Sequence, residues 1–131
     1  MKKLSLVITL ALFSLAFSSS AAKKLSDHQV LVDCNKSASA LVEFYEKEVK
    51  LKESRRLDLI EIISGACQYG YQSAQDGMQY KDIERGIIAD ARKEAPDYED
   101  QDPAVLERRV GLILASIQAG FYIFNNGGLS K

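Results

Sequence analysis

Residues 54–78 read SRRLDLIEIISGACQYGYQSAQDGM, and apolar side chains recur through this stretch at helical spacing. With Ser54 as N-cap, the pattern predicts a helix over 54–77. Its expected inward line consists of Leu57, Ile60, Ser64, Cys67, Tyr71, Ala74 and Met78. Beside that line runs a second one of small residues: Ala66, Gly70, Ser73 and Gly77. A glycine inside a helix costs about 1 kcal/mol of helix propensity. We therefore expect these small residues to admit a neighbouring backbone, unless Gly77 lies at the C-cap.

Upstream, Ser26 followed by Gln29 forms a capping box, which predicts a helix over 27–50. One stripe of this helix is apolar, and its members are Val30, Cys34, Ala38, Leu41, Tyr45 and Val49. Downstream, a shorter helix is expected over 80–94, ended by Pro96, with Ile83, Ile87, Ile88 and Ala91 inward.

The clearest helix start is Asp102-Pro103, an N-cap followed by proline at the first helical position. The helix it opens should cover 103–125 and end in Asn125-Asn126-Gly127-Gly128. No sustained strand-type alternation occurs after the first 22 residues. The expected fold is therefore all-α, a four-helix, disulfide-stapled bundle.

The disulfide is expected between Cys34 and Cys67, the two cysteines of the chain. In an antiparallel helical hairpin, the residue numbers of two facing residues add up to a constant, which is twice the number at the turn. The pairing of Cys34 with Cys67 therefore places the turn near residues 50 and 51. The break between residues 50 and 54, set by capping and charge alone, falls at that place. The alternatives are a bond between two molecules or two buried free thiols.

The first 22 residues have the composition of a secretory leader. Lys2 and Lys3 precede an uncharged apolar run over 4–17, and small residues lead to a cleavage site after Ala22. A retained anchor is the alternative, but the run is short of the ~20 residues that span a bilayer. We expect cleavage, a single helical domain over 23–131 with no integral membrane segment, and a periplasmic or secreted location.

Residues 110–124, VGLILASIQAGFYIF, carry no charge. A helix that is apolar all round must be covered all round, either by the other helices or by a second molecule. A domain of this size can hardly surround it, which favours a homodimer or partner interface. The candidate interface residues are Ile113, Ile117, Phe121 and Phe124.

The composition excludes several functions. The net charge of −1, or −3 without the leader lysines, makes nucleic acid an unsuitable partner. No metal-ligand or catalytic motif is present, and the single histidine, His28, is expected to be solvated at a helix start. With the cysteines joined, no free thiol remains as a nucleophile. We therefore expect no enzyme activity, cofactor or metal.

In an up-down-up-down bundle, the basic turn near residue 52 and the acidic loop near residue 99 lie at the same end. They either neutralise one another or form a charged rim suited to protein association. The candidate partner-binding residues at this end are Lys52, Arg55, Arg56, Tyr98, Glu99 and Asp100.

The segment around Cys67-Gln68-Tyr69-Gly70-Tyr71 and Asp76-Gly77, with the earlier Cys34 and the later Pro103-Ala104, resembles the small helical immunity proteins of type VI secretion systems. Those proteins often carry a Cys-x-Gly-Tyr-x-x-Gly-x-x-Asp-Gly helix. Here Gly70-Tyr71 lies one residue further from the cysteine, and Ala74 replaces the middle glycine. The resemblance implies a periplasmic, often dimeric protein that binds and blocks a cell-wall amidase or similar toxin.

The sequence thus predicts an exported, non-enzymatic binding protein that neutralises a partner protein, such as a secreted cell-wall-degrading toxin. The alternative is a periplasmic stress protein or chaperone that acts through an exposed apolar helix.

Overall fold

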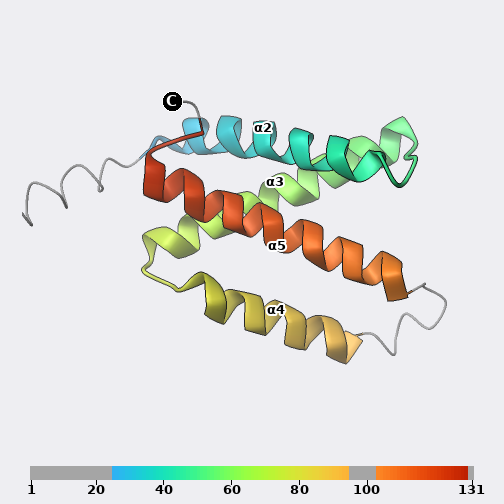
Figure 1. Ribbon diagram of the computed structural model, residues 1–131. Helices are drawn as coiled ribbons and strands as arrows, with labels where there is room; N and C mark the ends of the chain where they lie inside the picture. Colours follow the sequence, from blue (N-terminus) through green and yellow to red (C-terminus); the bar gives the residue numbers. More distant parts are fainter. Residues whose placement is uncertain (1–24, 95–102, 130–131) are drawn as a thin grey trace, which may run out of the picture.

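The computed structural model describes residues 25–94 and 103–129, and these residues form four helices. The helices are α2 (Asp27–Glu46), α3 (Glu53–Gln75), α4 (Tyr80–Glu94) and α5 (Pro103–Asn126). No strand occurs within the described ranges, and Cys34 and Cys67 form a disulfide. The predicted all-α, disulfide-linked four-helix bundle is therefore confirmed. Figure 1 shows that successive helices alternate in direction and that α5 lies between α2 and α4.

The start of α2 is confirmed, because the Ser26 hydroxyl accepts a hydrogen bond from the Gln29 backbone N–H at 3.1 Å. The second half of the capping box is absent. The Gln29 side chain donates instead to Asp33 Oδ1 at 2.9 Å. The predicted end of this helix was wrong, since α2 stops at Glu46 and not at residue 50. By leaving the helix early, the chain brings Leu51 back against the apolar cluster formed by Ala38, Val42, Ile63 and Leu112.

α3 begins one residue before the predicted range, and its N-cap lies two positions before the predicted Ser54. The N-cap is Lys52, whose carbonyl accepts from the Arg56 N–H at 2.9 Å, so Ser54 already lies in the first turn. At the other end Gly77, with φ of 80°, follows the C-cap Asp76. A positive φ of this kind suits glycine, which lacks the Cβ that strains other residues there. Gly77 therefore ends the helix and does not admit a neighbour.

The start of α5 at Pro103 and its end near Asn126 agree with the predicted range. Gly127, with φ of 70°, follows the last helical residue, and the Gly128 N–H donates to the Ile123 carbonyl at 3.0 Å. The Asn126 side chain donates to the Tyr122 carbonyl at 2.9 Å. The Asn-Asn-Gly-Gly sequence thus satisfies carbonyl groups that the helix end leaves without a partner.

The largest interface between helices is that of α3 with α5. At its centre the two backbones touch, because a Cβ on Gly70 would overlap the carbonyl group of Ile117 and one on Gly120 would overlap that of Cys67. The expectation that small residues of α3 admit a neighbouring backbone is confirmed at Gly70. α5 also packs against α2 and α4, so the chain's own helices cover much of its apolar surface.

The apolar line expected for α3 is partly wrong. Leu57 is 57% exposed and Met78 is 46% exposed, whereas Ile63, which lies outside that line, is 1% exposed. α3 is covered on one side by α2 and on another by α5, and the contact with α5 turns the buried stripe toward Ile63 and Gly70.

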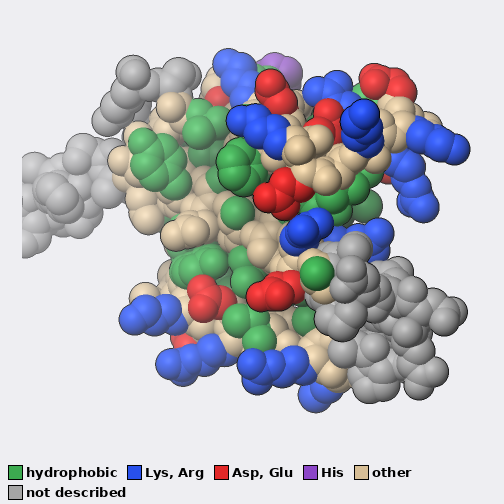
Figure 2. Space-filling model, turned by 45° about the vertical axis from the view of Figure 1, so that its right-hand side comes forward, with side chains coloured by type: hydrophobic (Ala, Val, Ile, Leu, Met, Phe, Trp, Pro, Cys, Tyr) green, Lys and Arg blue, Asp and Glu red, His purple; other side chains and the backbone are tan. Residues whose placement is uncertain are grey.

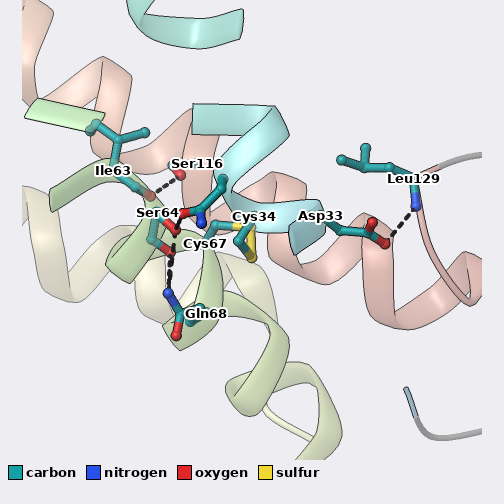
Figure 3. The surroundings of a disulfide bond; sticks show 9 residues. Asp33, Cys34, Ile63, Ser64, Cys67, Gln68, Ser116 and Leu129 are labelled. Atoms are coloured by element: carbon teal, nitrogen blue, oxygen red, sulfur yellow. Dashed lines mark hydrogen bonds between the residues drawn. A yellow bond between two sulfur atoms is a disulfide. The ribbon is translucent and has the colours of Figure 1, made fainter. Parts of the chain in front are cut away.

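The disulfide joins the middle of α2 to the middle of α3, with 5.5 Å between the two Cα atoms and both cysteines fully buried. Polar side chains surround it (Figure 3). The Ser64 hydroxyl donates to the Asn35 side chain and accepts from Gln68 Nε2 at 3.3 Å. The Ser116 hydroxyl of α5 donates to the Ile63 carbonyl. These bonds satisfy the polar groups that the helix contacts bury.

The two ends of the described chain, Leu25 and Leu129, pack against the same apolar cluster beside α2. Asp33 is 1% exposed, and its Oδ2 accepts from the Leu129 backbone N–H at 3.1 Å (Figure 3). The Leu25 N–H donates to the Tyr71 hydroxyl at 3.2 Å. Leu25 and Leu129 both pack against the apolar cluster that contains the disulfide.

α4 packs mainly against α5, over a smaller contact than α2 shares with α3. Ile83 is buried, and the other predicted inward residues, Ile87, Ile88 and Ala91, are half-buried. The Tyr80 ring meets the Phe121 ring edge to face, with 5.9 Å between centroids. The predicted apolar stripe of α4 therefore faces the bundle but is incompletely covered.

Candidate functional site

An apolar groove opens at the end of the bundle where the chain turns from α2 to α3 and where α5 begins. Two ion pairs lie at this end. Arg56 of α3 lies 2.9 Å from Glu46 of α2, and Arg108 of α5 lies 3.5 Å from Glu48 of the turn. The charged side chains at this end of the molecule are visible in Figure 2, with apolar side chains between them.

A groove of about 280 Å³ opens between these elements, and we refer to it as the turn groove. Tyr45 of α2 and Leu51 of the turn form one wall. The α3 wall consists of Arg55, Asp58, Leu59, Ile62 and Ile63. The α5 wall consists of Arg109, Leu112 and Ile113.

Helical spacing explains why these residues share a groove. On α3, residues 55, 58, 59 and 62 are three or four positions apart and so lie on one face, as do residues 109, 112 and 113 on α5. The buried members, Ile63 and Leu112, belong to the core cluster beneath the groove, and Leu51, Leu59 and Ile113 pack against that cluster. The floor of the groove is therefore held by the same contacts that hold the bundle.

The rim of the turn groove is positively charged. Arg55 and Arg109 are exposed, and neither has an ion-pair partner within the residues that the structure describes. Asp58 is the acidic residue of the lining. Arginine is always charged and binds carboxylates in a fork geometry, so unpaired arginines beside an apolar surface suit an anionic, partly apolar ligand.

The structure brings one of the predicted partner-binding residues, Arg55, into the turn groove. Lys52 is exposed at the N-cap of α3, outside the lining, and Arg56 is engaged in its ion pair with Glu46. The other three candidates, Tyr98, Glu99 and Asp100, lie outside the described residues.

The predicted interface residues of α5 are distributed differently from the expectation. Ile117 is 2% exposed within this chain, so its side chain lies in the core of the bundle, and the interface with a second molecule stays a prediction. Phe121 contacts the Tyr80 ring, and Phe124 contacts the Tyr71 ring with 5.5 Å between centroids. Ile113, which is half-buried, lines the turn groove. Because α5 contacts α2, α3 and α4, Ile117 is buried within the bundle and Phe121 and Phe124 are half-buried, while Ile113 remains open to the groove.

Sequence reasoning missed Arg109, Leu59 and Ile62. Arg109 directly precedes the uncharged run of α5, and no sequence pattern singled it out. Leu59 and Ile62 are apolar residues that lie beside the expected inward line of α3. Their spacing could have indicated a second apolar face on this helix. Ile62 is 59% exposed and Tyr69, seven residues further on the same face, is 51% exposed. This face continues the apolar surface beyond the groove.

Neither a metal-binding cluster nor a membrane-spanning segment is found in the part of the chain that the structure describes. Its histidine, cysteine and acidic residues form no group of three that could hold a metal ion. Across residues 25–94 and 103–129, no helix has the length and apolar character needed to cross a membrane.

Comparison with protein-family models, with curated proteins and with solved structures gives no match.

Proposed function

We propose that this chain is an exported, non-enzymatic protein that acts by binding another protein, in the favoured case a secreted cell-wall-degrading toxin that it neutralises. The observation that carries the proposal is the turn groove. It combines an apolar lining with two arginines that have no ion-pair partner among residues 25–94 and 103–129, and large apolar side chains of α3 remain exposed beside it. Exposed apolar surface with a charged rim is typical of protein-binding sites.

Export is supported by two independent features. The basic and apolar leader over 1–22 has the order of a secretory signal. The Cys34–Cys67 disulfide is of a kind that persists in oxidising compartments such as the bacterial periplasm. In the disulfide form neither sulfur is available as a nucleophile, which agrees with a binding role.

The proposal is tested by capture from the native envelope. The full chain, purified without reducing agent, is immobilised and exposed to envelope extract of its own organism. We expect one partner to be recovered in stoichiometric amount, to bind again when both proteins are pure, and to lose hydrolytic activity in the complex. Recovery of the immobilised chain alone would contradict the proposal.

A chaperone function is the second candidate, and the limited contact of α4 supports it. α4 packs mainly on α5, so its release would uncover Phe121, whose ring contacts Tyr80 of α4. This candidate requires that acid treatment increases the binding of a hydrophobic dye and suppresses aggregation of an unfolded client protein. Static light scattering at neutral pH would show whether the proposed homodimer forms. The same measurement after acid treatment would show whether the homodimer dissociates.

A further inference from the structure

The size of the turn groove limits what it can hold. Its volume is about 280 Å³, at the lower limit of the range of about 300–1,000 Å³ that is usual for small-molecule sites. A cavity of roughly 150 Å³ is sufficient for one benzene ring. The groove therefore has room for one bulky apolar side chain of a protein segment and for little more.

The charges around the groove limit the chemistry of that segment. Arg55 and Arg109 come from different helices, and both line the groove while their guanidinium groups remain without an ion-pair partner in the described residues. The other two arginines of this end, Arg56 and Arg108, are paired with glutamates. Asp58 offsets one of the two free charges, so the lining keeps a net positive charge.

We propose that the turn groove binds an acidic segment of a partner protein, with one bulky apolar side chain of that segment inserted between α3 and α5 and its carboxylates paired with Arg55 and Arg109. This inference rests on the protein-binding function proposed above and names the chemistry that its site recognises. The exposed side chains of Ile62 and Tyr69 extend the contact along α3. Arginine and aromatic side chains frequently dominate the energy of such interfaces.

A peptide titration tests the chemistry directly. The probe is a fluorescent peptide with one phenylalanine between two pairs of glutamates, added to the full chain purified without reducing agent. One control peptide has alanine in place of phenylalanine, and a second has lysines in place of the glutamates. We expect only the first peptide to bind, and its affinity to fall as salt is added, because the arginines are exposed.

Matched variants then locate the binding site. Ile62→Asp places a charge on the apolar lining and should weaken binding about tenfold or more. Leu57→Asp is its control, since Leu57 is on the same helix, is 57% exposed and does not line the groove. The double variant Arg55→Glu/Arg109→Glu should also lose binding, whereas Arg85→Glu, on exposed α4 surface, should retain it. Circular dichroism melting of each variant confirms that the fold is kept.

Three results would overturn the inference. The lysine peptide could bind as tightly as the acidic one, Ile62→Asp could bind like Leu57→Asp, or dodecanoate could bind at the groove while none of the peptides does. The last result would assign the groove to an anionic lipid.

Envelope capture with the same variants separates this inference from the proposed function. If a partner is captured equally by the wild type and by Ile62→Asp, the groove inference fails and the protein-binding function stands. If the acidic peptide binds as expected but no envelope protein is captured, the groove chemistry stands and the proposed function fails.

Discussion

Gly70 and Gly120 determine how closely α3 and α5 approach, since each lies against the backbone of the other helix. This contact positions the whole of α5, including Arg109 and Ile113 of the turn groove. A methyl group at either glycine has no free space, and the atoms that it meets belong to backbones that cannot rotate away.

We therefore predict that Gly120→Ala destabilises the protein. Alanine favours the helix by about 1 kcal/mol, but overpacking a rigid contact typically costs about 1–3 kcal/mol or more, and the overlap here is with backbone. Gly111→Ala is the matched control, because a Cβ at Gly111 of the same helix meets nothing within 4 Å. Urea unfolding should show a loss of stability for Gly120→Ala and a gain for Gly111→Ala. An equal gain in both would mean that the helices do not touch at Gly120.

Asp33 is a second residue with a specific structural role, because its buried carboxylate binds both the Gln29 side chain and the backbone of Leu129. We predict that Asp33→Ala releases the C-terminal residues and lowers stability by about 1–3 kcal/mol, since it leaves the partner groups unsatisfied. Hydrogen exchange at the Leu129 amide is the specific measurement. Asp90→Ala, at an exposed position of α4, should leave that amide protected.

Among the helices, α4 has the least contact with its neighbours, and a titratable residue lies at its start. Burial raises the pKa of Tyr80 above its ordinary value of 10.0, and a hydrogen bond to Glu84 and the charge of Glu84 raise it further. The folded protein thus holds the Tyr80 proton more tightly than the unfolded chain does. Stability from this group is complete below pH 10 and is lost as the pH rises through the folded-state pKa.

We predict that α4 loosens at alkaline pH before α3 and α5 do, and that Tyr80→Phe removes this dependence. Hydrogen exchange of α4 amides relative to those of α3, followed across the alkaline range, would measure the effect. Tyr122→Phe serves as control, because Tyr122 is 53% exposed on α5 and does not contact α4 through an aromatic pair. If Tyr122→Phe and Tyr80→Phe behave alike, the effect does not originate at Tyr80.

The elements that could be predicted from sequence are those specified locally. Ser26, Pro103 and the Gly127-Gly128 pair mark helix ends through local chemistry, and the position of the turn followed from capping and charge and agreed with the cysteine spacing. The burial of Ile63 and the exposure of Leu57 could not be predicted, because they depend on where α5 crosses α3. The turn groove also depends on where α5 crosses α3 and could not be predicted for the same reason. It joins Arg55 and Arg109, which are distant in sequence and meet only after the bundle has formed.

For the whole molecule, the distribution of contacts makes the disulfide important. The buried apolar side chains form two small clusters, one around Cys34 and Cys67 and one around Val42 and Ile63. α3 and α5 share the largest interface, while α2 has a smaller contact with α5 and depends on α3. The covalent bond between Cys34 and Cys67 fastens α2 to the pair of helices that holds the core together.

We predict that reducing this disulfide lowers the free energy of unfolding by about 3–4 kcal/mol, the chain-entropy value for a closed loop with a sequence separation of 33. Small domains are stable by only about 5–15 kcal/mol, so this is a large share of the total. Guanidinium unfolding with and without reducing agent measures the change, and Cys34→Ala/Cys67→Ala checks it without a reductant. Hydrogen exchange in the reduced protein should rise first in α2, because α3 and α5 keep their Gly70–Gly120 contact. Uniform loss of protection in all helices would show that α2 is not a separately anchored element.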